Sequence, residues 1–201
     1  MRAAYFVPIV LLLSGCFGGT GARPSPANYD LSAEKIEVDP GPVGMLRLVE
    51  VRSPSWLDTT AMQYRLAYAE KTRREAYAGS RWVAPPAGLL EQQLKRRLLA
   101  GGGSWSSQPA GCRLGVELDE FIQVFDGPAS SHVVLDARAT LWAARGDTPV
   151  ARQRFTVSRL AGGDARSGAV ALAAAAGQFG EDIGAWLRQA GGEALSHCRL
   201  S

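Results

Sequence analysis

The most specific chemistry in the sequence lies near the N-terminus, at a single cysteine. Leu13, Ser14 and Gly15 directly precede Cys16. A leucine followed by two small residues suits the pocket of a lipoprotein signal peptidase, which cleaves on the N-terminal side of the cysteine. The thiol of that cysteine takes up a diacylglyceryl group. This lipobox-like sequence therefore predicts that Cys16 is the lipidated N-terminus of the mature chain.

The residues before Cys16 have the composition of a signal peptide. Arg2 supplies a positive charge, and residues 3–13 are an apolar stretch interrupted only by Pro8. That stretch is too short to span a bilayer, which takes about 20 apolar residues, but it has the length of a signal-peptide core. We predict a cleaved signal peptide at 1–15. An ordinary secretory signal with a chance cysteine, or a buried N-terminal strand, is the alternative.

The predicted anchor also indicates a compartment. Two or more acyl chains hold a protein firmly on a membrane, at about 0.8 kcal/mol per buried CH₂. In Gram-negative sorting, an aspartate directly after the lipidated cysteine favours the inner membrane, and this chain has Phe17 there. We therefore expect a lipid-anchored protein of the outer membrane that faces the periplasm.

Cys112 and Cys198 remain once Cys16 is assigned to lipid. An even pair in an oxidising periplasm is typical of a disulfide. A bridge between them would close a long loop and contribute roughly 4 kcal/mol on the chain-entropy model. Two separate buried thiols are the alternative, because sequence does not show whether the Cα atoms approach closely enough.

Other residue types that could do chemistry lack the spacing for it. Neither His132 nor His197 has a second histidine or an acidic residue at metal-ligand spacing, so we predict no metal and no cofactor. Ser131, His132 and Asp136 are hydrolase residue types, but the sequence has no Gly-x-Ser-x-Gly turn. The glycine run at 101–103 has no lysine of a phosphate-binding loop after it and is more typical of a helix end. The chain is therefore predicted not to be an enzyme.

Three aromatic or basic residues are candidates for contacts with a partner or a lipid. Arg81 beside Trp82 could meet a headgroup or a protein surface. The favoured alternative is that Trp82 packs in the core while Arg81 pairs with a nearby acid. Trp56 could likewise be a rim contact or a core residue.

Composition limits the classes of protein to consider. A hydrophobic content of 46% predicts a folded chain. The net charge of +3 falls by one when Arg2 is removed, and no dense Lys/Arg cluster is interleaved with aromatics, so nucleic acid is not an expected partner. Residues 17–28 are rich in Gly, Pro, Ser and Thr and predict a tether. The folded domain should begin between Tyr29 and Val43, and we divide the mature chain into a tether at 16–40 and a single domain at 41–201.

Periodicity predicts six strands and two helices. Alternating apolar residues place strands at 43–52, 62–69, 75–77, 113–125, 132–142 and 150–157. One helix should follow Pro86 with Leu90, Leu94 and Leu98 on its apolar face and Lys95, Arg96 and Arg97 outward, and a longer helix should span 167–190. A change of parity before Phe121 predicts a β-bulge near Asp119. The expected fold is α/β, an α+β sandwich in which two amphipathic helices pack on a mixed, largely antiparallel sheet of about five to six strands.

A family resemblance follows from the order of short motifs along the chain. The motifs are Leu-Val-Glu-Val at 48–51, Pro-Ser-Trp-Leu-Asp at 54–58, Met-Gln-Tyr-Arg at 62–65, Tyr-Ala-Gly-Ser-Arg-Trp at 77–82, and Ala-Trp-Leu at 185–187. Together they resemble the ABC-type transport auxiliary lipoprotein family, which includes the PqiC-type lipoproteins.

The resemblance implies a non-enzymatic accessory subunit of an MCE-type system, which moves lipids between the inner and outer membranes. Its expected partner is an MCE-domain protein, which it docks at the outer membrane. The resemblance also allows a homo-oligomer. The alternative function is a periplasmic lipid carrier. A carrier needs an internal cavity of about 300 to 1,000 Å³, whereas a docking protein needs an exposed apolar patch.

Overall fold

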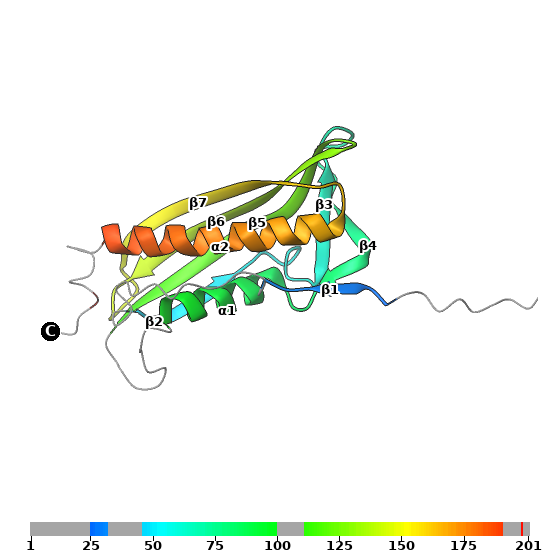
Figure 1. Cartoon of the computed structure of the whole chain (residues 1–201). Helices are drawn as coiled ribbons and strands as arrows, with labels where there is room; N and C mark the ends of the chain where they lie inside the picture. Colours follow the sequence, from blue (N-terminus) through cyan, green and yellow to red (C-terminus); the bar gives the residue numbers. More distant parts are fainter. Residues whose placement is uncertain (1–24, 32–45, 100–110, 191–197, 199–201) are drawn as a thin grey trace, which may run out of the picture.

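Seven strands and two helices make up the part of the chain described by the computed structural model, which is residues 25–31, 46–99, 111–190 and 198. The elements are β1 (Ala27–Tyr29), β2 (Leu46–Arg52), β3 (Ala61–Leu66), β4 (Glu75–Trp82), α1 (Pro86–Leu99), β5 (Cys112–Gly127), β6 (Ser130–Trp142), β7 (Pro149–Ala161) and α2 (Ala165–Gln189). Both helices lie on the same face of one sheet (Figure 1). The predicted fold class is confirmed, with one strand more than expected.

The sheet is built around the long strand β5. Its strand order is β1-β4-β3-β5-β6-β7, and β2 also pairs with β5. One side of β5 is shared, because β2 pairs with its first half and β3 with its last residues, both in parallel. On the other side, β5, β6 and β7 form the predicted antiparallel meander. β7 therefore has one neighbour and is an edge of the sheet.

The extra strand β1 corrects the predicted tether. Residues Ala27–Tyr29 pair in parallel with β4, where Tyr29 stands opposite Trp82, and Leu31 is buried in the core. The prediction of a tether through residue 40 is therefore wrong for residues 27–31. A strand of three residues is too short to show a two-residue period, so the sequence alone does not reveal it. Its partner β4 extends five residues beyond the predicted end at Tyr77, and β1 pairs with this added part.

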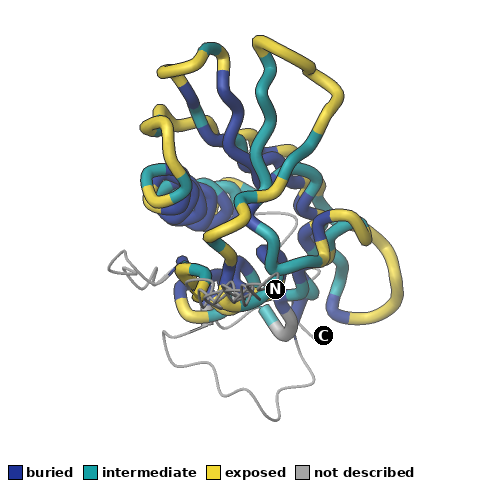
Figure 2. Tube along the Cα trace, turned by 90° about the vertical axis from the view of Figure 1, so that its right-hand side faces the viewer, coloured by how far each residue is buried: buried dark blue, intermediate teal, exposed yellow. Residues whose placement is uncertain are grey.

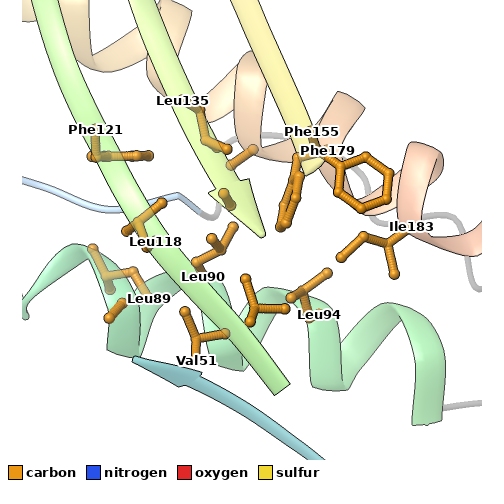
Figure 3. Close-up of a cluster of buried hydrophobic side chains, with 14 of the residues drawn as sticks. Val51, Leu89, Leu90, Leu94, Leu118, Phe121, Leu135, Phe155, Phe179 and Ile183 are labelled. Atoms are coloured by element: carbon orange, nitrogen blue, oxygen red, sulfur yellow. The ribbon is translucent and has the colours of Figure 1, made fainter. Parts of the chain in front are cut away.

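The core lies between the sheet and the helices. Alternate residues of β6 from Val133 to Leu141 are buried. Leu90 and Leu94 of α1 belong to the same cluster of buried side chains (Figure 3). A register shift between Leu118 and Glu120 confirms the predicted bulge. The shift keeps Phe121 on the same face as Leu118. Figure 2 shows the distribution of burial along the chain: buried residues lie in the helix and the strands that pack together, and exposed residues lie at the turns.

One basic residue of α1 is buried, against expectation. Arg97 was predicted to face outward but is only 6% exposed. A Cβ atom at Gly180 of α2 would lie 2.9 Å from Arg97 Nε, so this glycine leaves the space in which the guanidinium packs. The Nη2 atom is 3.7 Å from Glu181 Oε1. Arg97 is buried because α1 packs against α2. The spacing of residues within α1 does not predict this contact.

Helix α2 begins at a well-formed N-terminal cap. The Asp164 carboxylate accepts the backbone N–H of Ser167 at 2.7 Å, and the Ser167 side chain reaches back to the Asp164 backbone. The bond from the Ser167 backbone N–H lowers the pKa of the Asp164 carboxyl.

None of the described helices is both long and apolar enough to cross a bilayer.

Candidate functional site

The predicted lipid site lies outside the described residues. Leu13, Ser14, Gly15 and Cys16 all precede residue 25, where the description begins. Lipidation at Cys16 therefore stays a prediction.

Cys112 and Cys198 form a disulfide. Their Cα atoms are 4.7 Å apart, and both residues are buried. The bond ties residue 198 to the first residue of β5, across a sequence separation of 86. Of the two alternatives that the sequence left open, the structure contains the bridge.

The three predicted contact residues do not gather at one site. Trp82 is only 2% exposed, and its ring packs 5.4 Å from the ring of Phe121. This burial excludes Trp82 as a surface contact and assigns it to the core. Arg81 is exposed in β4. Trp56 lies in the turn after β2 and is 44% exposed.

Trp56 belongs to a charged cluster. The Arg74 guanidinium carbon lies 4.1 Å from the centroid of the Trp56 ring, which is cation–π geometry. Arg74 also forms an ion pair with Glu120, and Arg65 Nη2 lies 3.8 Å from the same carboxylate. The tryptophan is thus held by the protein's own arginine, and one face of its ring is already used.

Paired charges cover the sheet face away from the helices. Arg138 binds Glu117 at 2.9 Å and Asp119 at 2.7 Å. Arg154 Nε donates to Asp136 Oδ1 at 3.0 Å, and this bond lowers the pKa of the Asp136 carboxyl. These five charges are therefore paired within the chain.

A small polar pocket lies on the same face, where β2, β5 and β6 meet. It has a volume of about 250 Å³ and is lined chiefly by Glu50, Arg52, Arg113, Glu117, Trp142 and Asp147. A Cβ atom at Gly115 would lie 2.4 Å from Trp142 Cζ3, so this glycine lets the indole lie across β5. The pocket is smaller than typical small-molecule sites, which measure about 300 to 1,000 Å³.

A second hollow is an open groove between β7 and the first turns of α2. Its volume is about 910 Å³. Its lining is Ser158, Arg159, Leu160, Ala161, Gly162, Asp164, Arg166, Ser167, Val170, Ala171 and Ala174. Leu160 is 90% exposed and Val170 is 61% exposed. The sequence did not reveal this groove, because the predicted strand ends at Val157 and the position of α2 beside β7 depends on the tertiary structure.

The hydrolase residues are not assembled. Ser131 Oγ donates to the Gly162 carbonyl at 2.8 Å on the helix-covered face of the sheet. His132 points to the other face and lies 2.7 Å from Asp126, while Asp136 is engaged by Arg154. Among the described residues, no group of three His, Cys, Asp or Glu side chains could hold a metal ion.

The space in which a lipid carrier would need a cavity is filled by side chains. Leu135 and Phe155 from the sheet meet Phe179 and Ile183 of α2 (Figure 3), and the two phenylalanine rings are 5.5 Å apart in edge-to-face geometry. The two hollows described above both open on the outside of the domain. A bound acyl chain would therefore have to displace core residues.

Comparison with known proteins identifies the family. A family model described as the ABC-type transport auxiliary lipoprotein component matches residues 29–184. The chain belongs to this family. The match begins at Tyr29, the last residue of β1, so it starts within the segment that the sequence had assigned to the tether.

Solved structures share the fold. The crystal structure of protein XCC0632 from Xanthomonas campestris superposes with a TM-score of 0.67 at 20% identity, over 82% of this chain and 96% of that one. A crystal structure of an uncharacterized protein gives a TM-score of 0.61 at 15% identity, over 81% and 99% of the two chains. No curated protein matches the sequence. Family membership makes the chain an auxiliary component of an ABC-type transport system and a lipoprotein, in agreement with the predicted envelope location and with a role other than catalysis.

Proposed function

We propose that this protein is a non-enzymatic auxiliary subunit of an ABC/MCE-type intermembrane lipid transport system, and that it docks the transport apparatus at the outer membrane. The observation that carries the proposal is the family match, which spans residues 29–184 and so nearly the whole described domain. The MCE-domain partner and the outer-membrane location go beyond that match and rest on the motif order and on Phe17 after the lipobox.

The filled core supports docking over carriage. A carrier would bind lipid between the sheet and α2, where Phe155 and Phe179 pack against each other. A docking protein instead needs an exposed apolar surface. Leu160 and Val170 supply such a surface beside β7.

The position of the anchor limits where the domain can work. Residues 17–26 separate Cys16 from the first residue of β1. Even fully extended, a segment of this length reaches only about 35 Å. A lipidated Cys16 would therefore hold the domain close to the membrane surface, so a partner from the other membrane would have to cross the periplasm to reach it.

The test is purification of the intact lipoprotein from detergent-solubilised membranes, with mass spectrometry of bound proteins and lipids. We expect an MCE-domain protein to co-purify without a stoichiometric lipid in the domain. A Cys16→Ala variant should leave the membrane fraction and recover less of that partner. Recovery of one lipid per chain and no protein partner would contradict docking and favour the carrier.

A further inference from the structure

Strand β7 is a long edge that no described element covers. It runs from Pro149 to Ala161 and pairs only with β6. Backbone N–H and C=O groups on the outer side of an edge strand can pair with a strand from another chain. Proteins usually protect such edges with charged side chains, and β7 carries Arg152, Arg154 and Arg159 without any acidic residue.

The end of β7 departs from this protective pattern. The side chains on its solvent face are polar at Arg152, Arg154, Thr156 and Ser158, and the next one on that face is Leu160. A leucine that is 90% exposed on a sheet edge contributes nothing to the core and favours unwanted association. Its presence there is explained if a partner covers it.

The groove beside Leu160 continues the apolar surface onto α2. Val170 is 61% exposed, and Ala174 lies one turn further along the same flank of the helix. Arg159 and Arg166 border the groove. The site therefore combines a free backbone edge, an apolar floor and a rim that carries two arginines and the helix-capping Asp164.

We infer that the β7 edge and this groove bind an extended segment of the docked partner protein, which adds a strand to the sheet. Alternate side chains of an added strand point to opposite faces. Acidic side chains on one face would meet Arg152 and Arg154, which share the solvent face of β7, and apolar side chains on the other would lie over Val170 and Ala174. This inference rests on the proposed function, because it identifies the surface through which the partner is held.

A second copy of this chain fits the edge less well. Two β7 strands paired side by side would place Arg152 and Arg154 of both strands on one face of the joined sheet, and like charges on paired strands are destabilising. Of the other described strands with a single neighbour, β1 offers the three residues Ala27–Tyr29 and β2 the seven residues Leu46–Arg52. A lipid fits the apolar floor but cannot satisfy a row of alternating backbone donors and acceptors.

The chain offers a matched pair of variants. Val170→Glu changes the groove, and Val83→Glu changes a valine of similar exposure, 61% against 55%, that follows β4 at the other side of the sheet. Leu160→Glu is a second groove variant. All three side chains are exposed, so each variant should fold, which circular dichroism checks.

The binding probe is a labelled synthetic peptide that alternates valine and glutamate, and a valine–lysine peptide controls for charge. Fluorescence polarisation with the full-length protein in detergent should show binding of the glutamate peptide alone. Val170→Glu and Leu160→Glu should each weaken it at least about tenfold, and Val83→Glu should leave it unchanged. Equal binding of both peptides, no binding, or an equal effect of all three variants overturns the site.

The same variants in the membrane purification separate the two proposals. Loss of the MCE-domain partner from both groove variants, but not from Val83→Glu, supports the β7 site. An MCE-domain protein that co-purifies equally with every variant leaves the docking function standing and overturns the site. Groove variants that retain the partner but separate copies of this chain from one another overturn it too, because the edge would then join copies.

Discussion

Gly168→Ala tests how the N-terminal end of α2 is locked to the sheet. A Cβ atom at this position would lie 2.0 Å from Gln123 Oε1 and 2.7 Å from its Cδ. Gln123 in β5 is only 1% exposed and cannot easily turn away. Its Oε1 accepts from the Tyr77 hydroxyl at 2.9 Å, and its Nε2 donates to Ser131 Oγ and to the Gly162 carbonyl, both at 2.8 Å.

The expected loss follows from these three hydrogen bonds. Each contributes about 1 kcal/mol net, so displacing the Gln123 amide costs about 3 kcal/mol. Alanine is a better helix former than glycine by about 1 kcal/mol, which offsets part of that cost. The variant should therefore lose about 2 kcal/mol of unfolding free energy.

Urea denaturation measures this as a lower midpoint at an unchanged slope. In a thermal scan, the melting temperature should fall by roughly 4 to 8 °C, at about 2 to 4 °C per kcal/mol for a domain of this size. Gly88→Ala in α1 is the matched control, because a Cβ there would meet nothing within 4 Å. That variant should be neutral or slightly stabilised.

A double-mutant cycle with Gln123→Ala isolates the clash. The loss caused by Gly168→Ala should largely disappear once the Gln123 side chain is gone, with a coupling energy of about 1 to 3 kcal/mol. If Gly168→Ala unfolds at the same urea concentration as the unaltered protein, the lock between Gln123 and α2 does not exist as described.

Three further predictions concern stability. Cys112→Ser with Cys198→Ser removes a bridge across a sequence separation of 86 and should cost about 4 kcal/mol; a loss below about 1 kcal/mol in urea would contradict the entropic reasoning. Phe179→Ala empties a fully buried site and should cost about 3 to 5 kcal/mol in the same assay, and a smaller loss would mean that the core can collapse around the gap. The Asp136 carboxyl has a lowered pKa because Arg154 donates to it, so its stabilising effect is full above the unfolded pKa of about 3.9 and is lost as pH falls below that value. Asp136→Asn should therefore lower stability at pH 7 by about 1 kcal/mol and flatten the acid side of the stability curve, and an unchanged curve would refute this assignment.

Local sequence patterns were sufficient to predict the long strands and helices. The two-residue period in β6 and the four-residue spacing of leucines in α1 reflect burial on one face, and both predicted the correct faces. The change of parity in β5 likewise predicted the bulge before Glu120. Where an element is long enough to repeat its period, the sequence carries the information.

Other features depend on neighbours that are distant in sequence. β1 exists because β4 supplies a partner for its three residues. Arg97 is buried because Gly180, on the other helix, leaves space for it. Gln123 is a polar residue in a buried strand, and only the position of Tyr77 and Gly162 explains it.

By itself, the sequence determined the predicted lipid anchor, the fold class, the family resemblance and the apolar faces, since each of these is written in short motifs or in regular spacing. Only the tertiary structure decided that Cys112 reaches Cys198, that Trp82 is buried, that the core is filled, and that Leu160 and Val170 share one groove. The physical reason is that burial and proximity are properties of packed pairs. A residue's own type and its near neighbours in the chain do not specify which distant element lies against it.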